Sequence, residues 1–221
     1  MGISFIITAG GIGKRMGSEQ PKQFLIIGNQ PILMHTIARL HAYDPTAQLL
    51  VTLPVTYFSE WQQLCELHSF SIKHTLVAGG EERFHSIKNA LAKCTGTYVA
   101  VHDGVRPFVS KELLERLFQA VSAHKAVIPV IAVNESLRQV AENGTNAAVE
   151  RAAYRVVQTP QVFEAVLLRL AYEIPYNSSF TDDASLVELS GQSIHLVAGS
   201  VDNIKITQPI DLVIAANLLG S

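Results

Sequence analysis

The sequence contains few cysteines and no excess of positive charge, and each shortage excludes a class of protein. Only Cys65 and Cys94 occur among the 221 residues, with no Cys-x-x-Cys pair and no close cluster of histidine and cysteine. A disulfide framework or a zinc site is therefore not expected, and we predict two free, buried thiols. The net charge of −2 at pH 7 also argues against a nucleic-acid partner, since a sequence-independent binder normally carries a basic excess.

Long hydrophobic runs are also missing. No stretch reaches the length of a membrane span, and the N-terminus has no basic segment followed by an apolar run of the signal-peptide type. We therefore expect a cytoplasmic protein without membrane contact. What the chain does contain is 48% hydrophobic residues, enough for a large core, and its length fits a single domain over residues 1–221.

Strand and helix patterns alternate along most of the chain. Apolar strands are expected at 4–9, 48–55, 75–78, 98–101, 126–133, 156–159 and 194–198. Helices are expected from Pro31 to Leu40 and at 57–68, 81–92, 111–123, 161–172, 182–190 and 209–219, with Thr181 as the cap of the one at 182–190. This alternation predicts an α/β fold, a mostly parallel twisted sheet with helices on both faces.

The alternation breaks at about 134–155, where we predict a β-hairpin arm. Two short alternating runs, 137–141 and 147–151, flank Asn143-Gly144, and Asn-Gly between such runs is a strong hairpin signal. The runs hold few large apolar residues, so the hairpin is expected to leave the domain. A two-stranded arm is marginally stable alone, which favours pairing with a second subunit in a two-fold homodimer. A free surface hairpin is the alternative.

A glycine-rich, basic turn follows the first strand directly. It reads Ala9-Gly10-Gly11-Ile12-Gly13-Lys14-Arg15, and Pro21-Lys22-Gln23 comes soon after. Glycines let the backbone approach a ligand closely, and the exposed N–H groups of such a turn attract anions. No Gly-Lys-Ser/Thr follows as in a Walker A loop, and Met16 replaces the third glycine of a dinucleotide fingerprint. The turn favours phosphate binding, with a purely structural turn as the alternative.

Other informative turns also follow predicted strands, and turns after parallel strands share one edge of the sheet. Ligands of such folds bind at that edge. Together the turns supply five cations and two carboxylates: Arg15, Lys22, Arg83, Arg106 and Lys205 against Asp103 and Asp202. This excess of cations suits a triphosphate and a phosphorylated partner. For Asp103 three roles remain open: to orient a ribose, to help hold a metal ion, or to pair with Arg106 in a structural turn.

Six motifs span the chain in order: Gly11-x-Gly13-x-Arg15-Met16 with Pro21-Lys22-Gln23, Gly79-Gly80-Glu81-Glu82-Arg83-x-x-Ser86, Val101-His102-Asp103-Gly104-x-Arg106-Pro107, Thr159-Pro160-Gln161, Thr181-Asp182-Asp183-Ala184 and Asp202-Asn203-Ile204-Lys205-Ile206-Thr207. Together they resemble the 2-C-methyl-D-erythritol 4-phosphate cytidylyltransferase family. The first motif is shared with sugar nucleotidyltransferases generally, whereas the third and the last are far more specific. The resemblance implies a Rossmann-like nucleotidyltransferase fold.

The resemblance also implies a reaction. CTP and 2-C-methyl-D-erythritol 4-phosphate give 4-diphosphocytidyl-2-C-methyl-D-erythritol and pyrophosphate, a step in the non-mevalonate isoprenoid pathway. The catalytic cations implied are Arg15, Lys22 and Lys205. Mg²⁺ or another divalent cation is expected on the triphosphate, held mainly by the CTP phosphates, with Asp103 as a candidate protein ligand.

Binding residues are implied in the same way. For CTP they are Ala9, Gly10 and Gly11 through the backbone, Gly80, Glu81 and Ser86 at the cytosine, and Asp103 and Gly104. For the polyol phosphate they are Asp103, Arg106, Ser136, Arg151 and Thr181. Ser136 and Arg151 lie on the predicted arm, which in this family enters the pocket of the neighbouring subunit.

Three alternatives remain at this point. A ribitol-5-phosphate cytidylyltransferase shares most of the motifs, and the arm and the Thr181 segment would distinguish it. A non-catalytic nucleotide-binding subunit of the same fold would usually have lost the two lysines, Lys22 and Lys205, which this chain retains. An NAD(P)-binding dehydrogenase is disfavoured by the imperfect glycine pattern.

Overall fold

The computed structural model describes residues 2–11 and 20–220. The strands are β1 (Ile3–Thr8), β2 (Ile26–Ile27), β3 (Gln30–Pro31), β4 (Gln48–Leu53), β5 (Thr75–Ala78), β6 (Tyr98–Asp103), β7 (Ala126–Ala132), β8 (Arg138–Val140), β9 (Asn146–Ala148), β10 (Arg155–Val157), β11 (Gln161–Glu164) and β12 (His195–Ala198). The α-helices are α1 (Ile32–Tyr43), α2 (Phe58–Leu67), α3 (Arg83–Leu91), α4 (Lys111–His124), α5 (Ala165–Ala171), α6 (Asp183–Leu189) and α7 (Pro209–Gly220). Short 3₁₀ helices are η2 (Lys22–Phe24), η3 (Val55–Tyr57) and η4 (Arg151–Ala153).

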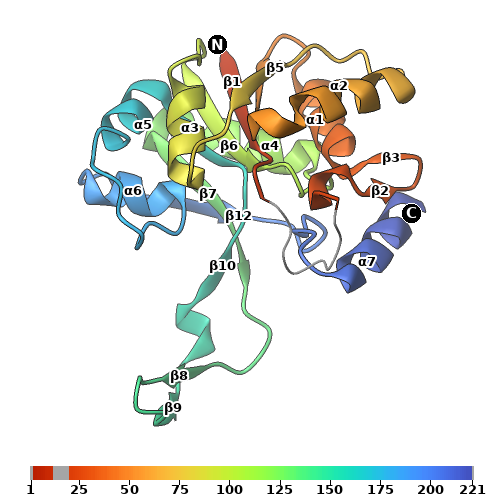
Figure 1. The fold of residues 1–221 in the computed structure, drawn as a ribbon. Helices are drawn as coiled ribbons and strands as arrows, with labels where there is room; N and C mark the ends of the chain where they lie inside the picture. The colour runs from red at the N-terminus through yellow and green to blue at the C-terminus, as the bar shows by residue number, and fades with distance from the viewer. Residues whose placement is uncertain (1, 12–19, 221) are drawn as a thin grey trace.

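The centre of the molecule is an eight-stranded sheet in the order β10-β7-β11-β6-β1-β4-β5, with β12 added on β7. The pairs β6-β1, β1-β4, β4-β5 and β7-β12 are parallel, whereas β10 and β11 run antiparallel to their neighbours. The predicted mostly parallel α/β sheet is therefore confirmed. The carboxyl ends of β1, β4, β5 and β6 lie at one edge, on the side of the body from which the arm emerges (Figure 1).

Alternating residues of the strands contribute side chains to two hydrophobic cores, one on each face of the sheet. Phe5 and Ile7 of β1 pack with α1, α2 and α4, whereas Ile6 between them packs with α3, α5 and α6. This alternation is what a strand buried on both faces requires, because successive side chains point to opposite sides. A third, smaller core joins α7 to the segment after β6 and contains Val105, Ile206 and Ala215.

The predicted helix at 161–172 is wrong at its start. Residues Gln161–Glu164 form β11, which inserts between β6 and β7, and only Ala165–Ala171 is helical. Gln161, Val162 and Phe163 are buried there, so pairing on both edges outweighs the local helical pattern.

The predicted cap of the helix at 182–190 is also wrong. Thr181 does not cap α6, because the helix begins one residue later than that role requires. The side chain of Asp182 accepts from the Ser185 backbone N–H at 2.9 Å, and these two residues form a capping box.

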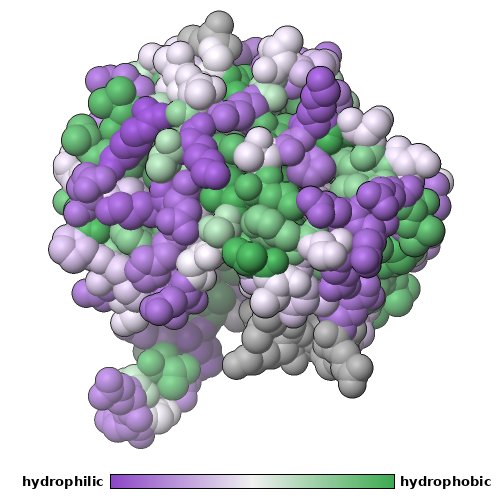
Figure 2. Space-filling model, turned by 45° about the horizontal axis from the view of Figure 1, so that its top comes forward, coloured by the Kyte–Doolittle hydropathy of each residue, from purple (hydrophilic) through white to green (hydrophobic). Residues whose placement is uncertain are grey.

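The arm predicted at about 134–155 is present as a hairpin that extends well away from the body (Figure 1). Its paired strands, β8 and β9, are shorter than predicted, and Arg151 falls in η4 instead of a strand. Gly144 adopts φ +83°, as an Asn-Gly turn requires. Figure 2 shows the arm clear of the body, with hydrophobic side chains among its hydrophilic ones. Val140 is 68% exposed and Tyr154 47%.

Both cysteines are free thiols, as predicted. Cys94 is buried, but the predicted burial of Cys65 is wrong, because its side chain is only half-buried on α2. Within residues 2–11 and 20–220, no helix combines the length and the apolar character needed to cross a bilayer.

His102 of β6 is fully buried beside the carboxyl edge. Its Nε2 lies 3.1 Å from the Arg106 carbonyl oxygen, and its Nδ1 lies 3.0 Å from Thr159 Oγ1. A neutral ring that carries its proton on Nε2 satisfies both contacts, donating to the carbonyl and accepting from the hydroxyl. Thr159 Oγ1 in turn accepts the Asp103 N–H at 3.1 Å. Burial disfavours the charged imidazolium and lowers the pKa of His102 to about 4.

We expect acid to destabilise the fold through His102. In the unfolded chain the pKa returns to its ordinary value of 6.5, so the unfolded state takes up a proton between about pH 6.5 and pH 4 that the folded state does not. Stability therefore falls as pH falls through this window, by about 3 kcal/mol in total. Denaturant unfolding of the wild type and His102→Gln at several pH values measures this. An equally steep pH dependence in the variant would contradict the assignment.

Candidate active site

A cavity of about 340 Å³ opens at the carboxyl edge of the sheet. Its floor is a row of side chains at one level of three neighbouring strands, because Thr8 of β1 pairs with Thr52 of β4 and with Asp103 of β6. Residues paired in this way point to the same face of a sheet. The walls come from the turn after β1, the turn between β5 and α3, η2, and the segment before α7. Parts of the chain that are far apart in sequence therefore meet in one space.

The turn after β1 forms one wall. Ala9 extends the sheet, since its N–H donates to the Thr52 carbonyl at 3.0 Å. Gly10 and Gly11 follow and line the cavity, and a Cβ placed on Gly11 would lie 3.6 Å from Cε of Lys22. The Lys22 side chain thus runs beside the glycine backbone, and backbone N–H groups and a cation line the same space.

The turn after β5 forms a second wall. The Gly79 N–H donates to the Leu53 carbonyl at 2.8 Å, and the Gly80 N–H donates to Ser86 Oγ at 3.0 Å. Ser86 Oγ donates in turn to the Glu82 carbonyl at 3.2 Å, which ties the turn to the first turn of α3. A Cβ on Gly80 would lie 2.3 Å from Cβ of His85, so only glycine fits.

Asp103 is the electrostatic centre of the cavity. Its Oδ2 lies 3.1 Å from Nζ of Lys205 and 3.1 Å from Nε of Arg106, and its side chain is 10% exposed. Burial alone would raise the pKa of this carboxyl, but Lys205 and then Arg106 and Arg83 lower it well below its usual range. Asp103 is therefore ionised at any physiological pH and holds the Lys205 ammonium over the cavity.

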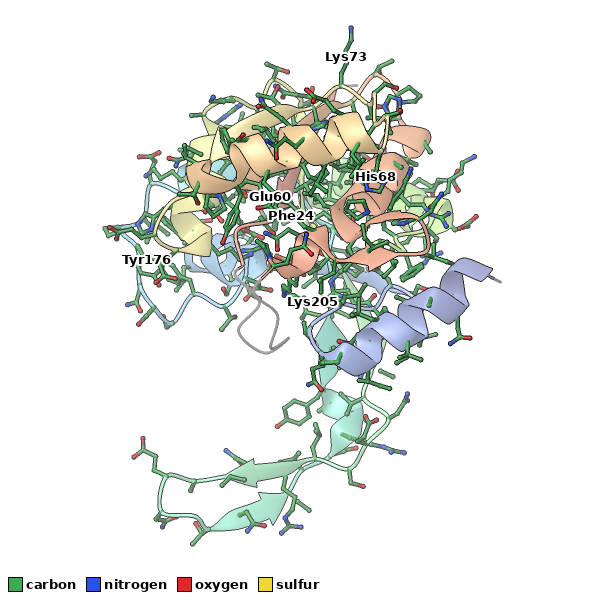
Figure 3. The ribbon with its side chains drawn as sticks, turned by 45° about the vertical axis from the view of Figure 1, so that its right-hand side comes forward. Phe24, Glu60, His68, Lys73, Tyr176 and Lys205 are labelled. Carbon is green, nitrogen blue, oxygen red and sulfur yellow. The ribbon has the colours of Figure 1, made fainter. Side chains whose placement is uncertain are left out.

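The backbone fixes both cations around Asp103. Arg106 Nη1 donates to the Asn203 carbonyl at 2.7 Å, and Asn203 Nδ2 donates to the Thr159 carbonyl at 2.8 Å. The Ile206 N–H, next to Lys205 in the chain, donates to the Val105 carbonyl at 3.0 Å. Figure 3 shows Lys205 at the end of the body that faces the arm, below Phe24. The segment 203–206 is thus fastened to the turn after β6.

Arg83 is a lining residue whose partner the sequence did not reveal. Its guanidinium donates to both carboxylate oxygens of Asp183, at 3.1 and 2.6 Å, and Tyr172 OH donates to the same carboxylate at 2.6 Å. Burial and the Asp183 charge raise the pKa of Tyr172 well above its usual value. This cluster joins the first turn of α3 to that of α6. The motifs contain both Arg83 and Asp183, but no local spacing predicts their contact.

The structure brings together most of the residues expected at the nucleotide. Those that line the cavity are Ala9, Gly10, Gly11, Lys22, Gly80, Glu81, Ser86, Asp103 and Lys205. Gly104 lies just behind it, where its carbonyl accepts from Thr36 Oγ1 at 2.9 Å. Arg106 is buried behind Asp103, which confirms the pairing offered as one of three roles for that carboxylate. Arg15 lies outside the described residues.

The other expected residues lie elsewhere. Ser136 and Arg151 are exposed on the arm, where Arg151 Nη1 donates to the Asn134 carbonyl, and Thr181 is exposed before α6. These three residues and Asp202 are absent from the described lining of this chain's cavity.

Some lining residues had no role assigned from the sequence: Thr8, Gln23, Thr52, Pro54, Glu82 and Val105. Thr8 and Thr52 follow from strand register, which a single sequence does not give. Glu82 and Val105 lie inside two of the motifs, so their neighbours were the available signal.

The cavity fits a polyanion with a cation bound to it. Lys22, Arg83 and Lys205 line it together with backbone N–H groups, against the carboxylates of Asp103, Glu81 and Glu82. No group of three or more His, Cys, Asp or Glu residues that could enclose a metal exists in the described part of the chain. A divalent cation would therefore need oxygen ligands from the bound polyanion, and Asp103 is a hard oxygen donor of the kind Mg²⁺ prefers.

Comparison with known proteins agrees with this chemistry. A family model described as 2-C-methyl-D-erythritol 4-phosphate cytidylyltransferase (IspD) matches residues 3–221. A relative of that name from Bacteroides fragilis is 52% identical over 215 residues, which is 97% of this chain and 98% of the relative. One from Bacteroides thetaiotaomicron is 50% identical over 217 residues, covering 98% of this chain and 99% of the relative.

Solved structures share the fold over the full length. The 2-C-methyl-D-erythritol 4-phosphate cytidylyltransferase of Thermus thermophilus superimposes with a TM-score of 0.82 at 32% identity, covering 100% of both chains. The 4-diphosphocytidyl-2C-methyl-D-erythritol synthase of Anaerococcus prevotii superimposes with a TM-score of 0.84 at 26% identity, covering 99% of this chain and 96% of that one. The chain thus belongs to the 2-C-methyl-D-erythritol 4-phosphate cytidylyltransferase family of nucleotidyltransferases.

Proposed function

We propose that the cavity binds CTP and that this chain transfers its cytidylyl group to 2-C-methyl-D-erythritol 4-phosphate. One observation carries the assignment of residues: Lys22 and Lys205, from opposite ends of the chain, line the same cavity as the glycine turn. The relatives at about half identity bear the name of this enzyme, which argues against a non-catalytic subunit and against a dehydrogenase.

The reaction joins two anions. A phosphate oxygen of the polyol phosphate attacks the α-phosphorus of CTP and forms a new P–O bond. The bond to the bridging oxygen breaks in line, and its electron pair leaves with pyrophosphate. The attacking oxygen is already ionised near neutral pH, so no general base is needed, and no histidine lines the cavity in the described residues. Lys22 and Lys205 reduce the repulsion and stabilise the charge that develops on the α-phosphate, and Arg15 acts on the leaving pyrophosphate.

Asp103 prepares Lys205 for this role. Because the carboxylate is ionised and fixed by Arg106, it holds the ammonium group 3.1 Å away before any substrate arrives. A cation held in place in this way needs little reorganisation during the reaction. We assign the same carboxylate to the ribose hydroxyls, the backbone of Gly10 and Gly11 to the phosphates, and the Gly80 turn to the cytosine.

Mg²⁺ or a similar divalent cation is the expected cofactor. When bound it neutralises part of the triphosphate charge, with Asp103 as the candidate protein ligand. CTP is a cytoplasmic metabolite, so we place the reaction in the cytoplasm.

The arm supports a homodimer with shared pockets. Its apolar side chains Val140 and Tyr154 are exposed, and the hairpin stands clear of the body (Figure 1). Ser136 and Arg151, expected at the polyol phosphate, are exposed there as well. We infer that the arm enters the neighbour's pocket, where Arg151 would hold the phosphate of the polyol substrate, with Arg106 and Thr181 nearby. Ribitol 5-phosphate remains the rival substrate, since most of the cavity would accept either.

Replacement of either cavity lysine should abolish most of the turnover. Lys22→Ala and Lys205→Ala are each expected to lower kcat by about 10²–10³-fold, because each removes a preorganised donor from the transition state. Pyrophosphate release measures this. Lys73→Ala is the control, since Lys73 points into solvent at the opposite end of the body (Figure 3). Unchanged kcat in both cavity variants, with the control also active, would refute the roles assigned.

A comparison of the two polyol phosphates as substrates tests the choice between them. With CTP held constant, kcat/KM for 2-C-methyl-D-erythritol 4-phosphate should exceed that for ribitol 5-phosphate, measured as pyrophosphate release. A preference for ribitol 5-phosphate would overturn the choice of substrate while leaving the cytidylyl transfer intact.

Mixing two inactive variants tests the shared pocket. A heterodimer of Lys22→Ala and Arg151→Ala contains one pocket with both defects and one with neither, if each arm serves the partner. Random mixing should then restore about one quarter of the wild-type rate, since half of the dimers are mixed and each has one intact pocket. No recovery above the activity of the separate variants would show that each pocket is built from one chain.

A further inference from the structure

The turn that carries Lys22 is fastened to two different parts of the fold. It is the 3₁₀ helix η2, and its next two residues, Gln23 and Phe24, are both buried. Gln23 contacts the turn after β1, and Phe24 contacts α2. The backbone of η2, which carries Lys22, is therefore held beside the glycine turn by contacts of the next two residues.

Gln23 makes the contact with the glycine turn. Its Nε2 donates to the Ala9 carbonyl at 2.6 Å, and the residue is 1% exposed. The amide has one favourable orientation here, because a flipped Oε1 would set an acceptor against the carbonyl. Oε1 itself is buried with no hydrogen-bond partner among the described residues. An unpaired buried acceptor is costly, so the value of this buried amide lies in the bond that it donates.

Phe24 makes the contact with the body. Its ring stacks on Trp61 of α2 with 5.7 Å between centroids and 19° between planes. Trp61 Nε1 donates to His74 Nε2 at 2.8 Å, which fixes the indole. This contact does not involve Ala9, so η2 stays docked on α2 when Gln23 is changed. The change removes the hydrogen bond between η2 and the turn after β1.

That hydrogen bond determines how Lys22 lies beside the glycine backbone. Ala9 is held on its N–H side by the Thr52 carbonyl and on its carbonyl side by Gln23. With both in place, the backbone of Gly10 and Gly11 and the Lys22 side chain form one rigid wall. Without Gln23, the Ala9 N–H still donates to the Thr52 carbonyl, so the glycine turn stays on the sheet while η2 can shift against it. A displacement of about 1 Å at a catalytic group can cost about 100-fold in rate.

We propose that Gln23 is a positioning residue for cytidylyl transfer, one that fixes Lys22 against the glycine turn through the Ala9 carbonyl. The inference rests on the proposed role of Lys22. Gln23 borders the cavity at only 1% exposure, and in this role it acts through Lys22 and not on the reacting atoms. Its effect should therefore vanish when Lys22 is absent.

Gln23→Met is the direct test. Methionine has nearly the same length, fills the buried site and cannot donate to Ala9. We expect kcat to fall by about 10- to 100-fold with little change in KM for CTP, because Lys22 acts on charge that develops only in the transition state. Gln48→Met is the control for general damage to the fold. Gln48 Nε2 also donates to a backbone carbonyl, that of Lys93 at 2.9 Å, and its Oε1 accepts from Ser4 Oγ and Thr95, but at the amino end of β4.

The control is expected to lose thermal stability and keep its kcat within about twofold. For Gln23→Met, kcat within about twofold of wild type would overturn the proposal. So would an equal loss of kcat in both variants, because it would indicate general damage to the fold.

A double-mutant cycle separates positioning from a merely structural effect. Gln23→Met is expected to change kcat by less than about twofold in a Lys22→Ala background, so that the two losses do not add. If Lys22→Ala lowers kcat and the losses multiply, Gln23 does not act through Lys22 and the proposal is wrong. If Lys22→Ala alone leaves kcat unchanged, the proposed role of Lys22 is wrong and the inference falls with it.

Discussion

The contact between Asp103 and Lys205 is the interaction on which the cavity depends. A buried carboxylate is costly unless it is paired, and here it is paired with Arg106, three residues further along, and with Lys205 from a distant segment. Because this charge must be paired, the segment before α7 is held against the end of β6. The third, smaller core, which contains Val105, joins the same two parts of the chain. The same attraction leaves an ammonium group fixed over the cavity that we propose to bind CTP. Stability of the fold and preparation of the site therefore arise from one cluster.

Much of the fold can be predicted because its signals are local. The apolar strands around Ile6, Leu50 and Val99 are recognisable from short runs. Serine is a favoured N-cap, and Ser110 occupies that position of α4, where its Oγ accepts from the Leu113 N–H at 3.2 Å. β11 is different, because its strand state exists only through pairing with β6 and β7 on both edges. A sequence window that covers only residues 161–172 contains no trace of those partners.

The residues of the site also fall into two groups, those that local sequence signals reveal and those that only the folded structure reveals. The glycine turns and the lysines can be recognised in the sequence, since their residue types are unusual after a strand and their chemistry is specific to anions. Thr52 and the contact between Arg83 and Asp183 cannot. A threonine in a strand is ordinary until the register brings it to the cavity, and no local spacing pairs Arg83 with a residue 100 positions away. The residues on the arm could be recognised only by resemblance, because no contact within one chain relates them to the cavity lining that the structure describes.

The place of Lys205 near the end of the chain has a consequence for synthesis. A ribosome makes the protein from its N-terminus, and the early strands can begin to fold before the last residues emerge. Until residue 205 leaves the exit tunnel, Asp103 has Arg106 but lacks its second cation, and the core formed with α7 is missing. The edge of the sheet that carries the proposed site is therefore completed late, and a nascent chain that ends before residue 205 would lack one of the two proposed lysines.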